Sequence, residues 1–355
     1  MGGLLAKTYA NYRQRRYRRW KLQVCFTKFG TITIFTFWGF SCILREQPNA
    51  YKCLYWSVKN ERNNMLLGIF LLITTGLLWV VIGSVISLSA CKGKNLDRIQ
   101  ADSALFCILV CVGWLWSTGA HFPSPLITIL LILAGAANYF TFLLMNRAMQ
   151  LGHHGIVWSL VQSALICPFL MGVIFLGVAC SPVRIVGIIG ILGGILLTGV
   201  KRHEMKGENC NNKCFFVTLA AFAMAGLTQC LTNLPSYLNG AAGYYVGKTF
   251  ALQLGTLLAF GVKNLRFQQW RGAVNWKLML ILSGATLVAE CFFFYRGLDL
   301  VAQAGVGAIG YPVALGSCIV GFALYSVLIL REKVSFLSAT STSLCLIGII
   351  LLSLA

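Results

Sequence analysis

Residues 131–161 read LILAGAANYF TFLLMNRAMQ LGHHGIVWSL V, and a related pattern occurs again later in the chain. Four pairs of positions match at an offset of 149 residues: Gly135/Gly284, Ala136/Ala285, Arg147/Arg296 and Leu151/Leu300. Four more match at an offset of 150: Gly76/Gly226, Gly155/Gly305, Ala164/Ala314 and Leu165/Leu315. Chance matching in an apolar sequence is the alternative, but the nearly constant offset favours a chain built from two related halves.

The composition is that of a membrane protein. Hydrophobic residues make up 58% of the 355 residues and charged residues 11%, whereas soluble domains carry about 25% charged residues. The mean hydropathy is +0.77. The net charge of +20 would suggest a nucleic-acid partner for a soluble protein. Here the basic residues lie between apolar segments, so we expect them to set the topology and to contact anionic lipid, with no nucleic-acid partner.

Ten apolar segments follow residue 64, most of them close to the roughly 20 residues that cross a bilayer. They are Met65–Ala90, Ala104–Thr118, Pro125–Met145, Ile156–Val178, Val183–Val200, Phe215–Leu234, Ala242–Val262, Leu278–Tyr295, Val306–Leu330 and Phe336–Leu354. We predict an all-α polytopic membrane protein with ten transmembrane helices in two five-helix inverted repeats. The repeats occupy residues 65–200 and 214–355, and a polar linker, residues 201–213, joins them.

Residues 1–64 form a basic N-terminal extension that contains one further apolar segment. Arginines and lysines dominate residues 13–21, and Leu22–Leu44 follows them. This segment is either an extra membrane helix or a cleaved signal peptide. Residues 1–64 as a whole either belong to the functional protein or precede a shorter one that begins near Met65.

The distribution of basic residues predicts the orientation in the membrane. Connections that follow odd-numbered helices of the ten hold fourteen Lys and Arg residues, whereas the even-numbered connections hold Arg184 and Arg296. The positive-inside rule places the odd connections in the cytoplasm. The C-terminus is then outside, and a spanning Leu22–Leu44 would give eleven spans. We expect a multi-pass protein of the plasma membrane, or of the inner membrane in a bacterium.

Ionisable residues inside apolar segments are candidate functional residues, because each costs about 2.5–3.5 kcal/mol on insertion scales. Glu290 lies well inside the eighth segment, where a carboxyl group can take up and release a coupling proton. Lys248 lies near the start of the seventh segment, where it can pair with Glu290 or bind an anionic substrate. The alternatives are a structural carboxyl group for Glu290 and a lysine that extends to the membrane surface.

Uncharged polar and aromatic residues give further candidates for solute contact. Gln162 and Trp158 are one turn apart in the fourth segment, and Tyr311 lies at nearly the same depth in the ninth. Gln229 and Asn233 are one turn apart in the sixth. Pro168 breaks the backbone hydrogen-bond ladder, which often happens where a helix lines a cavity. Packing between helices is the alternative role for these residues.

Three charged residues lie at predicted helix ends: Arg147, Arg296 and Glu332. Their expected role is either a helix-end contact or a gate. His153 and His154 are expected to be a solvated pair in a loop. The fourteen cysteines are expected to pack as small hydrophobic residues. We expect no metal site and no cofactor, and we find no nucleotide-binding or hydrolase motif.

Ten helices in two halves with short connections resemble the drug/metabolite transporter superfamily, specifically the EamA-type carriers. The resemblance covers about Met65–Ala355. Leu328–Lys333 reads LILREK and precedes a helix with Gly348, similar to the family's Glu between helices nine and ten. Asn233–Tyr237 resembles the L-rhamnose–proton symporter branch. The first half departs from the family pattern, since no Glu stands near Pro182, and family members have both ends in the cytoplasm.

The resemblance implies a secondary transporter rather than an enzyme. We expect a small organic solute, such as a sugar, an amino acid, a nucleoside or a drug-like compound, with protons as the coupling ion. The protein would be a monomer or a homodimer. Two alternatives stay open: a membrane-embedded enzyme that acts on a lipid or lipid-linked substrate, and a membrane adaptor that transports nothing.

Overall fold

The computed structural model describes residues 48–119, 121–176, 181–204, 212–238, 243–264, 274–304, 307–332 and 336–354. The chain divides into two units, Met1–Asn63 and Asn64–Ala355. Of the first unit, only the beginning of helix α4 (Pro48–Cys91) is described. The basic N-terminal stretch and Leu22–Leu44 lie outside the described residues, so the predictions for them stay predictions.

The unit from Asn64 onward is helical, and its described ranges contain no strand. After α4 come α5 (Leu96–Thr118), α6 (Pro125–Leu151), α7 (His154–Gln162), η1 (Ser163–Leu165), α8 (Ile166–Leu176), α9 (Pro182–Glu204), α10 (Asn212–Asn233), η2 (Leu234–Tyr237), α11 (Tyr245–Lys263), α12 (Trp276–Val288), η4 (Ala289–Phe294), α13 (Tyr295–Gln303), η5 (Gly307–Ile309), α14 (Gly310–Leu328) and α15 (Phe336–Leu354). Each predicted apolar segment overlaps one of these helices or a run of consecutive ones.

Seven helical stretches in the described residues are long and apolar enough to cross a membrane. They are Asn63–Cys91, Leu96–Thr118, Pro125–Leu151, His154–Met171, Lys213–Asn233, Trp276–Gln303 and Gly310–Leu328. Many of their large apolar side chains are exposed, among them Leu109 at 63% and Phe216 at 63%, as expected for surfaces that face lipid. The protein is therefore an all-helical polytopic membrane protein. For α9, α11 and α15, spanning the membrane stays a prediction.

Local sequence explains where several helices begin and bend. The Asn95 side chain accepts a hydrogen bond from the Arg98 amide and caps α5, which therefore starts eight residues before the predicted segment. Pro125 occupies the first turn of α6, where a missing N–H costs nothing. Pro168 cannot donate to the carbonyl four residues earlier, and the helix tightens into the 3₁₀ turn η1 just before it.

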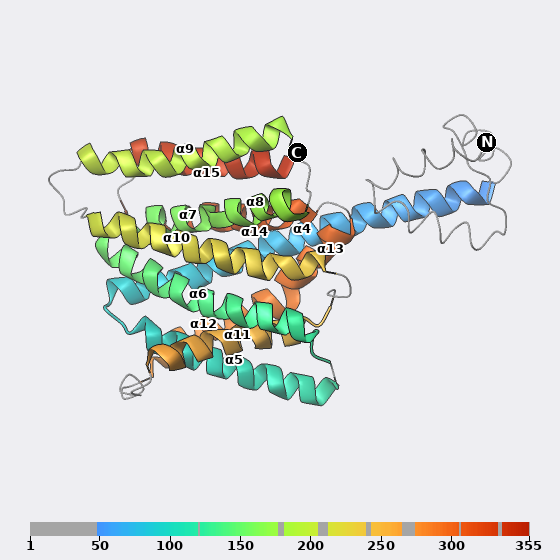
Figure 1. Ribbon diagram of the computed structural model, residues 1–355, viewed down its shortest axis with the longest axis horizontal. Coiled ribbons are helices and arrows are strands. Elements are labelled where there is room, and N and C mark those ends of the chain that lie inside the picture. The colour runs from blue at the N-terminus through green and yellow to red at the C-terminus, as the bar shows by residue number, and fades with distance from the viewer. Residues whose placement is uncertain are drawn as a thin grey trace. The chain divides into compact units, whose positions relative to one another are not determined.

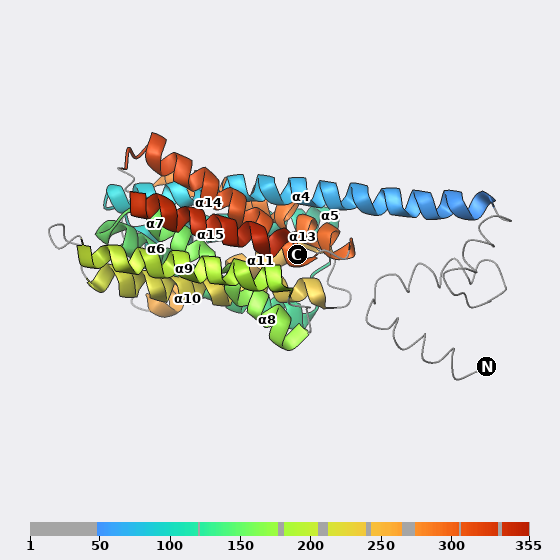
Figure 2. The same ribbon diagram turned by 90° about the horizontal axis from the view of Figure 1, so that it is seen from above.

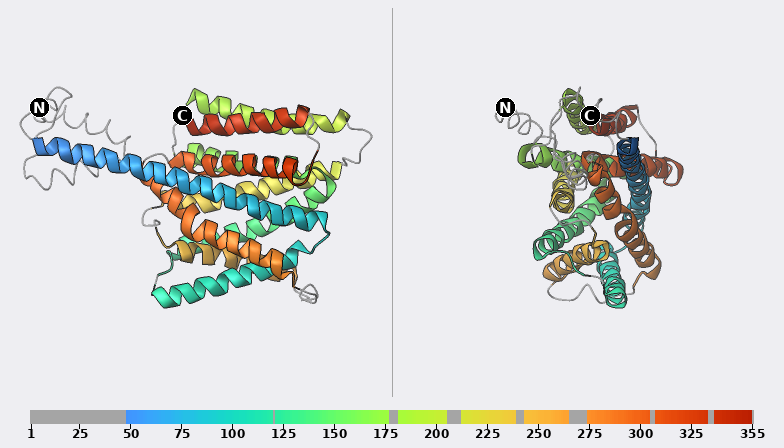
Figure 3. Two further views of the ribbon diagram at one scale, coloured as in Figure 1. Left: turned by 180° about the vertical axis from the view of Figure 1, so that it is seen from behind. Right: turned by 90° about the vertical axis from the view of Figure 1, so that its right-hand side faces the viewer.

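Helices from the two halves of the sequence pack on each other in matching pairs. Helix α9 packs along α15, α7 on α14, and α5 on α11. Helix α6 packs on α11, and α12, the counterpart of α6 in the second half, packs on α5, the counterpart of α11. Figure 1 shows α9 and α15 side by side with α7, α8 and α14 beneath them, and Figure 2 shows the same neighbours from above. The end-on view in Figure 3 shows the helices of this unit running roughly along one direction.

Two glycines that match in sequence make matching contacts. A Cβ atom added to Gly76 would meet Ala314 and Ser317, whereas one added to Gly226 would meet Ala164 and Cys167. The two contacts involve corresponding positions: Gly76 and Gly226, Ala164 and Ala314, and Cys167 and Ser317 are each 150 residues apart. Glycine allows the backbones of α4 and α14, and of α10 and α8, to approach closely. The pair Gly135 and Gly284 differs in this respect. A Cβ atom added to Gly135 would collide with the Leu252 carbonyl oxygen, whereas one added to Gly284 would meet no atom.

Contacts near helix ends bring four of the odd-numbered connections to one end of the unit. His154, at the end of the third connection, contacts Ser87 near the end of α4 and Glu332 in the ninth connection. The third and fifth meet where the Cys214 thiol donates to the Ala148 carbonyl oxygen. The described basic residues of these connections, among them Lys92, Lys94, Arg147 and Arg331, therefore lie at the same end.

Candidate functional site

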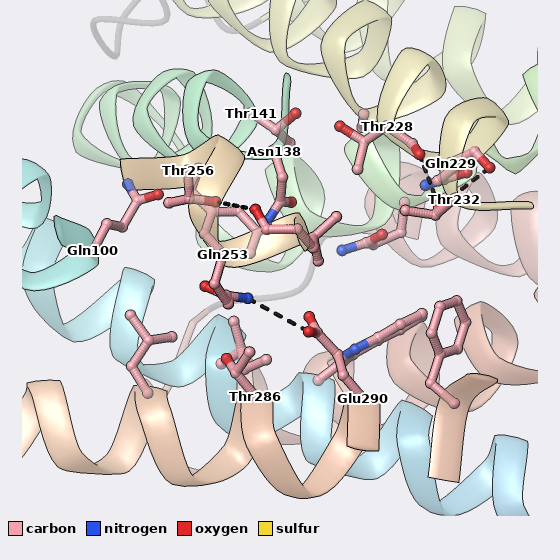
Figure 4. A pocket seen from close by; sticks show the side chains of 18 of the residues that line it. Gln100, Asn138, Thr141, Thr228, Gln229, Thr232, Gln253, Thr256, Thr286 and Glu290 are labelled. Carbon is pink, nitrogen blue, oxygen red and sulfur yellow. Dashed lines mark hydrogen bonds between the residues drawn. The ribbon is translucent and has the colours of Figure 1, made fainter. Parts of the chain in front are cut away.

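A cavity of about 120 Å³ lies between helices of both halves, and Figure 4 shows its polar side chains. Its lining comes from α4, α5, α6, α7, α10, α11, α14 and the bent helix formed by α12, η4 and α13. The lining comprises Trp79, Ile82, Gln100, Ser103, Asn138, Thr141, Phe142, Trp158, Gln162, Ala225, Thr228, Gln229, Thr232, Leu252, Gln253, Thr256, Leu282, Thr286, Glu290, Phe294, Tyr295, Tyr311 and Leu315.

Glu290 is the only charged side chain among these lining residues. It belongs to the π-helical turn η4, a distortion that occurs frequently at functional sites because it redirects side chains. The Gln253 amide nitrogen of α11 lies 3.4 Å from Glu290 Oε2, and Figure 4 shows the two side chains pointing toward each other. The carboxyl group is thus presented to the cavity with an amide donor on the facing helix.

Several polar groups in the cavity wall lack a hydrogen-bond partner in the described part of the protein. Both side-chain amide atoms of Gln100, the Oε1 atom of Gln229 and the hydroxyl group of Tyr295 are buried and unpaired. Leaving such groups unsatisfied is costly, and native proteins do so rarely. These groups line one cavity, so they are available to a polar ligand.

Aromatic rings form one side of the cavity next to Glu290. Phe294, one turn after Glu290, packs against Trp79 and Tyr311 with ring centroids 5.1 Å and 5.4 Å away. Tyr311 also shares a short hydrogen bond with the Thr232 hydroxyl. Its orientation is therefore fixed by α10, and Phe294 connects this aromatic cluster to the helical turn of Glu290.

The structure brings together five of the seven residues predicted to bind solute or protons. Trp158, Gln162, Gln229, Tyr311 and Glu290 all line the cavity. They come from four separate helical stretches, so the packing of the helices is what brings them together.

The other two predicted residues lie outside the cavity lining. Asn233 is buried, with 7% exposure, one turn beyond Gln229. Lys248 does not pair with Glu290. Its ammonium group lies 3.9 Å from Asp299 Oδ1 and 5.4 Å from the centre of the Tyr295 ring. Asp299 in turn accepts a hydrogen bond from the Gly243 amide. This pair joins the first turn of α11 to α13.

A second ion pair lies at the opposite end of α11. Lys263 Nζ and the Tyr139 hydroxyl group each donate to a different oxygen of Asp97, both at 2.6 Å. Asp97 lies in the first turn of α5, where a negative charge also suits the helix dipole. One carboxylate therefore joins α5, α6 and α11 at this end.

The charged helix-end residues have different roles. Glu332 accepts hydrogen bonds from the His154 and Gly155 amides, at 2.7 and 3.1 Å, and so caps α7. Arg147 and Arg296 are exposed and do not line the cavity. His154 was predicted to be solvated, which is wrong: it begins α7, is half-buried, and its Nδ1 lies 2.9 Å from the Ser87 hydroxyl.

Sequence reasoning found Gln229 but missed several other polar residues of the cavity, which occur as pairs three positions apart in apolar helices. These pairs are Gln100/Ser103, Asn138/Thr141 and Gln253/Thr256, and Thr232 lies three positions after Gln229. Residues three apart lie on one helix face. A search for such pairs would have found these positions.

Four pairs of lining residues are separated in sequence by the same offset that relates the two halves. At 150 residues, Trp79 corresponds to Gln229, Ile82 to Thr232 and Ser103 to Gln253, and at 149 residues Thr141 corresponds to Glu290. All eight residues of these pairs line the cavity. Within each pair, the second half supplies the more polar or longer polar side chain.

Comparison with known proteins identifies a similar fold but indicates no activity. No family model matches the chain, and no curated protein does. Among solved structures, 17 chains match. One, described as "Crystal structure of protein", aligns with a TM-score of 0.55 and 15% identity over 81% of this chain and 98% of that chain. At this identity the similarity establishes a shared fold alone.

Proposed function

We propose that the chain is a secondary transporter that moves small organic solutes across the plasma membrane by alternating access. The observation that carries this proposal is the cavity, which is lined by offset-related residues of both halves and contains unpaired polar groups. Repeat-built transporters bind solute at the interface of their repeats and expose that site to each side in turn. The matching helix pairs and glycine contacts support the same two-half, ten-span architecture, as does the resemblance to EamA-type carriers.

In this proposal, the ion pairs at the two ends of α11 are the gates. At a rise of about 1.5 Å per residue, Lys248 lies roughly 7 Å before Gln253 along the helix and Lys263 roughly 10 Å after Thr256. The pairs Lys248–Asp299 and Lys263–Asp97 thus lie on opposite sides of the cavity residues of α11. Breaking one pair while the other holds would open the cavity to one side only.

Glu290 is proposed to couple solute movement to a proton gradient. A carboxyl group without a fixed cationic partner can exchange a proton whenever its surroundings change between closed and open. The Gln253 amide lies on the same helix as both gates. Movement of α11 would therefore change the environment of Glu290 directly.

A solute screen on reconstituted vesicles tests the proposal. Purified protein is placed in vesicles with an imposed pH gradient, and uptake of sugars, amino acids, nucleosides and amine drugs is measured for wild type and Glu290→Gln. We expect gradient-stimulated uptake of at least one class, and loss of the stimulation in the variant. If wild type moves no solute, the transporter proposal fails and the enzyme and adaptor alternatives gain. If both proteins respond equally to the gradient, coupling through Glu290 is wrong.

A further inference from the structure

We propose that the solute of this cavity is a small organic monocation with an apolar body, such as a protonated amine, and that Glu290 holds its positive charge. This inference deepens the proposed transport function and rests on it for the role of the cavity. It concerns a different property, namely which charge the bound solute carries.

The charges around the cavity favour a cation. Glu290 brings one carboxyl group, and no Lys, Arg or His occurs among the lining residues. The two lysines of α11 have carboxylate partners of their own, Asp299 and Asp97. A charge in a membrane interior needs a partner of opposite sign. The bound solute, or a proton in its absence, supplies that partner. An anionic solute would meet a carboxyl group and no counter-charge.

The groups that line the cavity together with Glu290 suit an ammonium group. Phe294 lies one helical turn after Glu290, and its ring contacts those of Trp79 and Tyr311. The faces of aromatic rings attract cations, most strongly where water is excluded. The unpaired Oε1 atom of Gln229 is an acceptor for an N–H donor. A carboxylate, ring faces and an amide oxygen together match a protonated amine.

The apolar part of the lining indicates that the cation also has an apolar body. Trp79 and Ile82 come from the first half of the sequence, and Leu282 and Leu315 come from the second. Phe142 and Trp158 add further apolar surface from the first half. A solute that is charged at one end and apolar elsewhere uses both kinds of wall.

The test compares three probes of nearly equal shape and different charge: benzylammonium, benzyl alcohol and benzoate. Binding to the purified full-length protein in lipid nanodiscs is measured by calorimetry at neutral pH, and uptake of the same probes is measured in vesicles. We expect benzylammonium to bind at least tenfold more tightly than benzyl alcohol, and benzoate to show no binding. The proposal is overturned if benzoate or benzyl alcohol binds as well as the ammonium.

Two variants and a control test the role of Glu290 itself. Glu290→Gln should reduce the preference for the ammonium over the alcohol to about twofold or less. The double variant Thr141→Glu, Glu290→Thr moves the carboxyl group to the offset-related position and should restore a cation preference. Asp102→Asn removes a carboxylate that pairs with Arg98 outside the lining, and it should keep the wild-type preference. An unchanged preference in Glu290→Gln contradicts the proposal, and wild type remains the deciding measurement if a variant does not fold.

The two proposals fail in different ways. Ammonium binding without uptake would overturn the transporter function and leave the cation site standing. Uptake of the alcohol or the benzoate without a preference for the ammonium would support the transporter and overturn the cation site.

Discussion

Individual residues of the cavity leave buried polar atoms unpaired, at a cost in stability that binding of the proposed solute would offset. Gln229 exposes an acceptor to the cavity and leaves it unpaired. An unsatisfied buried polar atom costs about 1–3 kcal/mol. At this position, stability and ligand binding therefore make opposite demands on the side chain.

Gln229→Leu should have opposite effects on stability and on solute binding. The leucine removes the unpaired acceptor, so we expect unchanged or higher thermal stability, by up to about 1 kcal/mol. Solute binding should weaken about tenfold through loss of one hydrogen bond. Thermal unfolding in nanodiscs and binding calorimetry measure the two effects. Leu227→Gln, at an exposed apolar position of the same helix, is the control and should keep the affinity. Equal affinity in Gln229→Leu would show that this side chain does not contact the solute.

The buried pair of Lys248 and Asp299 gives a second prediction at the residue scale. Both side chains are at least 95% buried, and removing one partner of such a pair costs about 3–5 kcal/mol. Lys248→Met should therefore destabilise the protein by about that amount. Lys248→Met combined with Asp299→Asn should recover most of the loss, because no unpaired charge remains. Unfolding in detergent measures both. Equal stability of wild type and the single variant would mean that the pair contributes nothing.

At the scale of elements, α6 and α11 cross at two glycines. A Cβ atom on Gly255 would collide with the Ile132 carbonyl oxygen, whereas one on Gly261 of the same helix would meet nothing. Thr256 also donates to the Gly135 carbonyl oxygen at this crossing. Close backbone approach is therefore the condition that brings Gln253 into the cavity.

Gly255→Ala should separate the two helices and cost about 1–3 kcal/mol, as overpacking does. Gly261→Ala is the matched control. It should be neutral or stabilising by up to about 1 kcal/mol, because alanine favours the helix. Thermal unfolding in nanodiscs compares the two. Equal behaviour of the variants would contradict the close crossing.

The proposed gate at the end of α11 predicts a local change in dynamics. Asp97→Asn weakens the bonds to Lys263 and Tyr139 together. Amides in the last turn of α11 and the first turn of α5 should then exchange with deuterium several-fold faster. Amides of α9 and α15 should not change, and Asp102→Asn, which removes a partner of Arg98 within α5, should leave the last turn of α11 as it is. Wild-type exchange in Asp97→Asn would exclude this pair as a gate.

At the scale of the whole molecule, the proposed transport machinery lies within Asn64–Ala355, which forms a unit of its own. A chain that begins at Met65 contains every lining residue of the cavity. It should keep at least half of the solute uptake of the full chain, measured in the same vesicles at equal protein content. Complete loss of uptake in a folded, membrane-inserted protein would assign residues 1–64 to the function.

The positions of the helices follow from the sequence because insertion into a membrane depends on the apolar content of each segment. Segment length and hydropathy located the stretches that became α6 and α15, which both begin at their predicted residue. Pro168 marked the bend in the fourth helical stretch. A glutamate inside an apolar segment marked the cavity, because only a functional or paired carboxyl group is retained there.

Which side of each helix faces inward was decided only by the tertiary structure. Lipid and protein interior are both apolar, so the sequence pattern does not distinguish the two sides. Lys248 therefore turned to Asp299 instead of Glu290, and Gln253 entered the cavity unnoticed. The sequence by itself determined the helices and the membrane setting. The packing of two halves on each other created the site.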